Sequence, residues 1–488
     1  MKVTFVYPGI AVIGFNCLGG SSHDTISINL GLGYISSYLK KNSSHETDLI
    51  DLRDVQGWDQ YLKELASRNP EIVGIYCNTV NFQNSIKSAE LAKTLGKHVI
   101  MGGPHATLDP ESLLASGFVD SIIVGEGEVS FLHVVDLIAA GKQPDRIVKG
   151  LRIDDLDVIP FPDRDLYNME RILGGPGIFP YPSRYVGIIA SRGCHYNCAF
   201  CQPLEKIIFG QKIRTRSVAN IIAEVKSVIE RYQANFIMFE CDTLTTNKAW
   251  ALELCREMKS IPVTWGAQSR ADTIDDELAS AMHGAGCMVL FIGFESGSQR
   301  ILNLLRKGIT PQQSLQAGKV CRRNNLLIFA NYILGVPTET EDDLEMTYEL
   351  IRKMGPELHS PSYFSPIPGS DLFDYCKNTD LIKTNGYEDY IRNPTLEKIK
   401  GINYRLLDRF RDKMLDCKRS CWTEASFARH VLRRWAFLIG EGYWAILARE
   451  FAESLPVVVK VPLRVVNRVA MKALFIRVKD EKKYYPGT

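Results

Sequence analysis

Several features common in other protein classes are missing or scarce in this chain of 488 residues. No uninterrupted apolar run reaches the roughly 18 residues that a membrane-spanning helix needs, and the first residues lack the basic region and cleavage site of a signal peptide. The formal net charge is only +2, so nothing overall indicates a nucleic-acid partner. Twelve cysteines are too sparse for a disulfide scaffold. We therefore expect a cytoplasmic protein with reduced thiols.

Residues 1–145 alternate short apolar runs with helical patterns. VTFVYP, IVGIYC and SIIVG are typical of buried strands, and GYISSYLKK and EVSFLHVVDLIAA are typical of helices. This alternation predicts a parallel, doubly wound, Rossmann-like sheet. Ligands of such sheets bind beyond the carboxyl ends of the strands. The small and polar residues that follow those strands are therefore either ligand contacts or ordinary turns; they include Thr79, His105, Gly125 and Glu126.

The rest of the chain divides into three further segments by composition. Residues 146–185 are rich in Pro, Gly and Asp, which indicates a linker. Residues 186–372 hold six strand-and-helix units, which predict a partial (β/α)6 barrel with its active site at the carboxyl ends of the strands. Residues 373–488 are expected to be mainly helical and basic. From Leu396 onward the chain carries 20 Lys and Arg against 10 Asp and Glu, so these helices either cover the barrel or contact an anionic membrane surface.

The segment SRGCHYNCAFCQP follows the first strand of the barrel. It places Cys194, Cys198 and Cys201 within eight residues at C-x3-C-x2-C spacing. Thiolates bind soft metals, chiefly zinc and iron–sulfur clusters. Structural zinc usually takes four protein ligands, whereas three thiolates suit a 4Fe-4S cluster with one iron left open. The spacing therefore favours the cluster, and structural zinc stays as the alternative.

With Phe200 before its last cysteine, this motif resembles the signature of radical S-adenosylmethionine (radical SAM) enzymes. In that family the methionine end of S-adenosyl-L-methionine binds the open iron. The resemblance extends to FECDTLT, which implies that Glu240 and Asp242 hold the methionine amino group. IGFESGSQRILNLLRKG implies that Glu295 and Ser296 lie near the ribose. An arginine at the end of another strand, Arg270, is our candidate for the methionine carboxylate, and an ordinary surface ion pair is the alternative.

The first domain resembles the cobalamin-binding domain that one large branch of this family carries. The similar segments are LGLGYISSYLKK, VIMGGPHATLDPE and SIIVGEGEVSF. The resemblance makes Thr79, His105, Gly125 and Glu126 candidates for the cobalamin pocket. No D-x-H-x-x-G motif is present, which implies cobalamin bound without a lower His ligand. A domain that keeps the fold and no longer binds cobalamin is the alternative.

The two resemblances together imply a function. A 4Fe-4S cluster would cleave S-adenosylmethionine to a 5′-deoxyadenosyl radical, and the leading outcome is methyl transfer to an unactivated carbon. Cyclisation, ring contraction or another rearrangement without methylation is the second reading, and a non-catalytic iron–sulfur or zinc protein is the third. The expected partners are a small-molecule or lipid-like substrate and an electron donor such as flavodoxin or ferredoxin.

Overall fold

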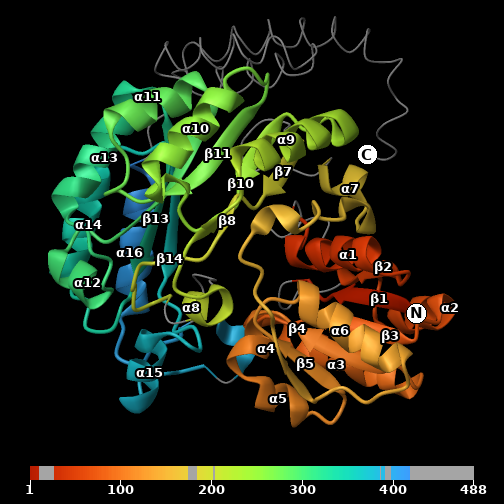
Figure 1. The fold of residues 1–488 in the computed structure, drawn as a ribbon. Helices are drawn as coiled ribbons and strands as arrows, with labels where there is room; N and C mark the ends of the chain where they lie inside the picture. Colours follow the sequence, from red (N-terminus) through yellow and green to blue (C-terminus); the bar gives the residue numbers. More distant parts are fainter. Residues whose placement is uncertain (10–26, 174–183, 202–203, 385, 391–396, 418–488) are drawn as a thin grey trace, which may run out of the picture.

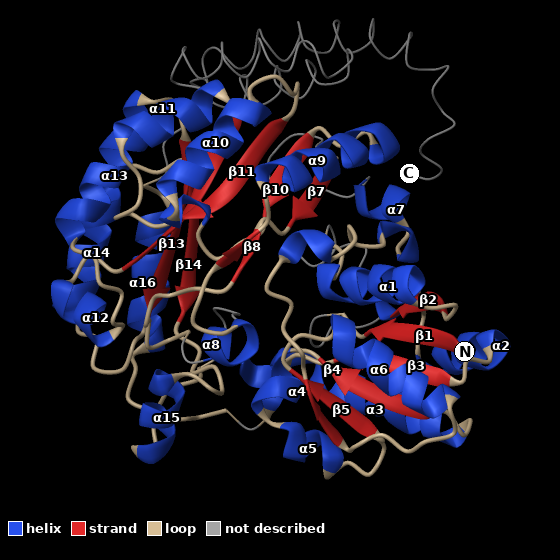
Figure 2. Ribbon diagram, viewed as in Figure 1, coloured by secondary structure: helices blue, strands red, loops and turns tan. Residues whose placement is uncertain are grey.

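The protein folds around two parallel sheets, which stand side by side in Figures 1 and 2. The structure is a computed structural model that describes residues 1–9, 27–173, 184–201, 204–384, 386–390 and 397–417. Each sheet has six strands, and helices connect successive strands. The architecture is the parallel α/β one that the alternation of apolar runs and helices predicts.

The first sheet has the strand order β2-β1-β3-β4-β5-β6, so the chain winds outward from β1 in both directions. Its central strands β1, β3, β4 and β5 are almost wholly buried because helices cover both faces. On one face Phe5 and Phe131 pack with their ring centroids 5.3 Å apart. Gly74 makes this possible, since a Cβ there would lie 2.9 Å from both rings. The elements are β1 (Lys2–Tyr7), α1 (Leu30–Asn42), β2 (Glu46–Asp51), α2 (Trp58–Arg68), β3 (Ile72–Tyr76), α3 (Phe82–Thr94), β4 (His98–Gly102), α4 (Pro104–Leu108), α5 (Pro110–Leu114), β5 (Ser121–Val124), α6 (Glu128–Ala139) and β6 (Ile147–Lys149).

The second sheet has the order β14-β13-β12-β11-β10-β7, so each strand pairs with the next strand of this sheet along the chain, while β8 and β9 form a separate antiparallel pair. It curves as an open barrel, with its helices on the outer face (Figure 2). The elements are β7 (Tyr185–Ile188), β8 (Ser191–Arg192), α8 (Leu204–Phe209), β9 (Arg214–Thr215), α9 (Val218–Tyr232), β10 (Phe236–Phe239), α10 (Lys248–Met258), β11 (Thr264–Ser269), α11 (Asp276–Gly284), β12 (Cys287–Glu295), α12 (Gln299–Leu304), α13 (Pro311–Arg323), β13 (Leu327–Leu334), α14 (Glu341–Met354) and β14 (Leu358–Tyr363).

The segment that joins the two sheets is packed against both of them. Its first residues form β6, the sixth strand of the first sheet, and it later forms the short helix α7 (Met169–Leu173). Arg164 donates to the Glu224 carboxylate on α9 at 2.7 Å, and Arg216 donates to the other oxygen of that carboxylate. All three side chains are buried. Because burying charge is costly unless it is paired, this arrangement fixes where the segment crosses to the barrel.

The chain returns toward the first sheet after the barrel. Helix α15 (Asp371–Asn378) is followed by a short 3-10 turn at Tyr387–Tyr390, and α16 (Tyr404–Leu415) packs on α14 and β14. No helix among the described residues is long and apolar enough to cross a membrane. The basic and aromatic segment expected to cover the barrel or contact a membrane surface lies mostly in residues 418–488, outside the described residues.

Candidate active site

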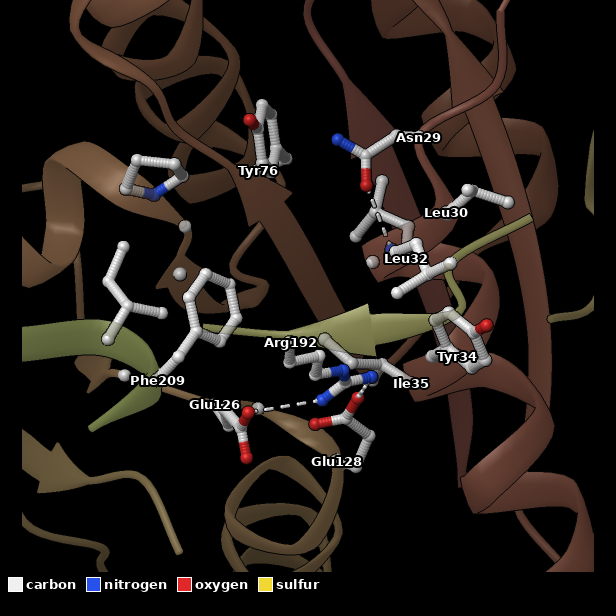
Figure 3. Close-up of a pocket in the computed structure, with 18 of the residues that line it drawn as sticks. Asn29, Leu30, Leu32, Tyr34, Ile35, Tyr76, Glu126, Glu128, Arg192 and Phe209 are labelled. Atoms are coloured by element: carbon white, nitrogen blue, oxygen red, sulfur yellow. Dashed lines mark hydrogen bonds and ion pairs between the residues drawn. The ribbon is translucent and has the colours of Figure 1, made fainter. Parts of the chain in front are cut away.

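The two sheets face one another across a cavity of about 480 Å³. Its lining comes from α1 and the carboxyl ends of β3, β4 and β5 on one side, and from β8, α8, β10 and β11 on the other (Figure 3). Four of the residues singled out in the sequence lie in this lining: Gly125, Glu126, Glu240 and Asp242. Doubly wound sheets and (β/α) barrels both bind their ligands at the carboxyl ends of the strands. The cavity therefore lies where both domains are expected to work.

The three closely spaced cysteines lie on the loop that follows β8. Cys198 is buried, and Cys194 and Cys201 are half-buried. Burial, the Glu205 carboxyl and the two other thiols together raise the pKa of Cys201 to about 12. The thiols therefore lie close enough to interact, and the Cys201 thiol keeps its proton until a cation displaces it.

The three thiols on this loop are donors of the kind that binds a soft metal or an iron–sulfur cluster. Among the described residues, no three His, Cys, Asp or Glu side chains converge at the spacing of one metal ion. A cluster of several irons is larger than an ion and separates its thiolates more widely. The donor set is thus consistent with the cluster that the C-x3-C-x2-C spacing predicts.

Arg270 lies against the cysteine loop. Its Nη1 donates to the Cys198 Sγ over 3.8 Å, and its guanidinium carbon lies 3.6 Å from the centre of the Tyr196 ring. It also pairs with Asp272 at 2.9 Å and donates to the Lys307 backbone oxygen at 2.7 Å. The alternative to a carboxylate contact was an ordinary surface ion pair, and the structure shows a pair in which Arg270 is buried and Asp272 is exposed. Arg270 therefore holds the loop in place.

Glu240 and Asp242 stand at the end of β10 and face the cavity. Tyr185 donates to Glu240 at 3.0 Å, and burial raises the pKa of the Glu240 carboxyl. Gly187 leaves room for this carboxylate, since a Cβ there would lie 2.3 Å from Glu240 Oε1. Burial likewise raises the pKa of Asp242. Two desolvated carboxyls beside the cysteine loop suit a cationic ligand such as an amino group.

Glu295 and Ser296 at the end of β12 contact other protein groups. Lys307 donates to Glu295 at 2.7 Å, and both side chains are buried. Ser296 is 0% exposed, contacts the Thr347 hydroxyl at 3.1 Å and accepts from the Ser298 N–H. Ser296 thus joins the end of β12 to α14. Neither residue lines the cavity.

A group of paired charges closes one side of the cavity, and Figure 3 shows part of it. Arg192 donates to Glu128 at 2.6 Å and lies 3.4 Å from Glu126. Arg214 donates to both oxygens of Glu126, at 3.0 Å to Oε2. All four side chains are buried. We call these residues the clasp, because they join the start of α6 to the strand pair β8–β9 that carries the cysteine loop.

Comparisons with known proteins identify both halves of the chain. Residues 188–351 match the model of the Radical SAM superfamily, and residues 17–135 match that of the B12 binding domain. An uncharacterized methyltransferase of Pyrococcus horikoshii is 31% identical over 392 residues, which is 76% of this chain and 83% of that protein. The chain belongs to the B12-binding radical SAM enzymes.

Two further relatives show how wide this family is. The anaerobic magnesium-protoporphyrin IX monomethyl ester cyclase of Rubrivivax gelatinosus is 24% identical, over 80% of this chain and 72% of the cyclase. The radical S-adenosylmethionine methyltransferase TsrM of Kitasatospora setae, solved with cobalamin and a [4Fe-4S] cluster bound, has a TM-score of 0.62 at 17% identity. That match covers 79% of this chain and 76% of TsrM, and it supports the fold of both domains together.

Thr79 and His105, two candidates in the B12-binding domain, lie outside the cavity. The two ring nitrogens of His105 contact the hydroxyls of Thr79 at 3.3 Å and Ser112 at 3.1 Å. The His105 ring packs at 4.7 Å on Tyr387, which comes from beyond the radical SAM core. These residues form a socket for Tyr387, whose hydroxyl donates to Asp109 at 2.9 Å.

Sequence reasoning missed several residues that shape this radical SAM site. Arg192 and Arg214 stand beside the cysteine motif, and their positive charges were visible, but their carboxylate partners are 64 and 88 residues away. Gln268 faces the cavity from β11, and its isolated polar side chain in the strand VTWGAQS was a usable signal. Glu205 lies near Cys201 with its Oε2 buried and without a hydrogen-bond partner. No pattern in the sequence distinguished Glu205.

Proposed function

We propose that this chain is a cobalamin-dependent radical SAM methyltransferase that modifies an unactivated carbon of a small molecule. One observation carries the proposal: a single cavity is bounded both by the B12-binding strand ends and by the strand ends that flank the cysteine loop. A methyl group carried on one side could therefore reach a substrate activated on the other. The relative from Pyrococcus horikoshii, itself named a methyltransferase, supports this reaction.

Each cofactor has a fitting set of residues. Cys194, Cys198 and Cys201 would hold the 4Fe-4S cluster, and Glu240 and Asp242 would hold the amino group of S-adenosylmethionine. Cobalamin would lie against backbone at the ends of β4 and β5, where Gly102, Gly103 and Gly125 line the cavity without side chains. When bound, the cluster and cobalamin supply the electron that cleaves S-adenosylmethionine to a 5′-deoxyadenosyl radical and the methyl group that is transferred.

The protein's own residues orient these groups and keep water out. Arg270 fixes the cysteine loop against β11 and the residues after α12. The clasp keeps the α6 end of the cavity attached to the strands that carry that loop, and its charges are satisfied before any ligand arrives. Such pre-organisation confines a reactive radical to the space beside the substrate. The electron would come from a flavodoxin- or ferredoxin-type donor.

A radical cyclisation or rearrangement is the second candidate, and the cyclase relative supports it. Both reactions begin with hydrogen abstraction and use the same cluster site. They differ in whether a methyl group reaches the product. That difference can be measured directly once a substrate is in hand.

The test is anaerobic reconstitution of the full chain, followed by iron, sulfide, zinc and cobalamin assays. The protein is then incubated with reductant, methyl-labelled S-adenosylmethionine and candidate substrates. We expect about four irons per chain, bound cobalamin, 5′-deoxyadenosine and labelled product. Deoxyadenosine without label in the product would support cyclisation or rearrangement. A protein that binds zinc, or an intact cluster that never yields deoxyadenosine, would contradict both enzymatic readings.

A further inference from the structure

The inner face of the barrel is accessible, although its strands are central in their sheet. Along β12 and β13 the exposure alternates: Phe291, Phe329 and Asn331 are half-buried, whereas their neighbours Leu290 and Ala330 are fully buried. Helices cover the outer face of both strands, so the accessible side chains point into the barrel. This face continues from the cavity, because Gln268 on β11 belongs to both.

Strand register places the inward side chains in rows. Gln268 pairs with Phe291, Phe291 with Phe329, and Phe329 with Leu358. The rings of Phe291 and Phe329 stack with centroids 4.5 Å apart and an angle of 18° between their planes. We call these two rings the aromatic shelf. Two amide side chains lie beside the shelf. Gln268 is next to Phe291 in the same row, and Asn331 is in the next row, two residues after Phe329 on β13.

The charges beside the shelf are already paired. Lys307 pairs with Glu295 close to Gly293, and Arg270 pairs with Asp272. Among the described residues that line the adjoining cavity, Arg192 is the only Lys or Arg, and two carboxylates neutralise it. A phosphate or phosphonate entering this space would therefore find no free cation, whereas a neutral ring loses little on leaving water.

From these observations we propose that the aromatic shelf binds the substrate through a flat, unsaturated, uncharged ring. Because the rings of Phe291 and Phe329 stack on each other, the face of the substrate ring would pack edge-to-face on their exposed edges, and the amides of Gln268 and Asn331 would bond its polar edge. The inference rests on the proposed function in one respect, which is that the barrel interior is the substrate site. It adds the chemical class of the substrate and the residues that select it.

The test measures binding to the reconstituted holoenzyme with S-adenosylmethionine present, by anaerobic equilibrium dialysis. Three probes separate the effects: indole-3-acetamide is flat and neutral, cyclohexylacetamide carries the same amide on a saturated ring, and phenylphosphonate is flat and anionic. We expect the wild-type protein to bind indole-3-acetamide at least about tenfold more tightly than either of the others. Only that probe has an aromatic face and carries no charge.

Variants assign this preference to particular residues. A double variant with Phe291→Leu and Phe329→Leu keeps apolar bulk, and we expect it to bind indole-3-acetamide no better than cyclohexylacetamide. Gln268→Leu should weaken both amides equally and leave the ring preference intact. Phe373→Leu, at a half-buried phenylalanine on α15 outside the barrel, is the matched control and should change neither.

The outcomes separate this inference from the proposed function. Equal binding of the three probes, no binding of indole-3-acetamide, or an unchanged preference in the double variant would overturn the shelf. Reductive cleavage of S-adenosylmethionine without substrate is measured on the same preparations. If S-adenosylmethionine is cleaved but the three probes bind equally, the shelf is refuted and the proposed radical enzyme stands. Ring preference without cleavage leaves the shelf standing and refutes the radical enzyme.

Discussion

The two walls of the cavity are built differently. The wall from the B12-binding domain presents glycine backbone, apolar side chains and carboxylates that arginines already neutralise. The wall from the radical SAM domain includes the polar side chains of Glu240, Asp242 and Gln268. The first wall is complete before any ligand binds, whereas the second has polar groups left for ligands. Substitutions in the first wall should therefore change the stability of the protein and the alignment of its two domains. Substitutions in the second wall should change the affinity for S-adenosylmethionine.

The strongest test of this difference removes a cysteine from the loop that lies beside the second wall. We expect Cys198→Ala to abolish the cluster and to lower S-adenosylmethionine cleavage by more than about a thousandfold, since no other group supplies the electron. Iron and sulfide content and deoxyadenosine formation measure the effect. Cys255→Ala, at a buried thiol on α10, is the control. Retention of iron by the Cys198 variant would refute the ligand assignment.

The next test breaks the clasp in the first wall. Glu126→Ala leaves Arg214 buried without its carboxylate, and we expect a loss of about 3 to 5 kcal/mol in the free energy of unfolding. Asp276→Ala, which removes the partner of the exposed Arg323, should cost about 1 kcal/mol or less. Denaturant unfolding of the reconstituted proteins gives both values. Equal losses would mean that the clasp is no more than a surface ion pair.

A third test measures how Glu240, in the second wall, affects S-adenosylmethionine affinity and the dependence of that affinity on pH. We expect Glu240→Gln to weaken S-adenosylmethionine binding about tenfold, roughly 1.4 kcal/mol, with little change in stability. Burial raises the pKa of the wild-type carboxyl, so its charged form, which holds an amino group, increases as pH rises. Wild-type affinity should therefore improve as the pH is raised, and the affinity of the variant should change less. Binding titrations of both proteins at several pH values measure this. If the affinities of the wild type and the variant changed with pH in parallel, Glu240 would be excluded as the contact of the amino group.

The smallest expected effect is at the socket for Tyr387. Tyr387→Phe removes the hydrogen bond to Asp109 and keeps the ring between Phe82 and His105. We expect a loss of about 1 kcal/mol in stability and no change in S-adenosylmethionine affinity. Thermal unfolding and the same binding titration measure the two quantities. A large loss of affinity would show that the socket belongs to the ligand site after all.

The sequence was sufficient for the parts of the fold that depend on local pattern. Apolar runs alternating with helices predicted two parallel sheets, and all six barrel strands form from the segments expected to form them. The first sheet also takes β6 from residues 147–149, which composition placed in the linker. That strand is short and largely exposed, so it lacks the apolar pattern that signals a buried strand.

The site was predictable only where neighbours in sequence act together. The three cysteines share one loop, and Glu240 and Asp242 share one strand end. Long-range partners decided the rest: Lys307 pairs with Glu295, Thr347 contacts Ser296, and a residue 278 positions from Asp109 fills the His105 socket. A single sequence does not reveal which distant side chain will satisfy a buried polar group.

The Tyr387 contact also has a consequence for the order in which the molecule is built. Domains generally fold as units during synthesis, the amino-terminal one first. The socket is complete once the B12-binding domain has folded, but its plug is synthesised only after the entire barrel. The contact therefore forms only after both domains have been synthesised, so it adds to the clasp between them and takes no part in the folding of either domain during synthesis.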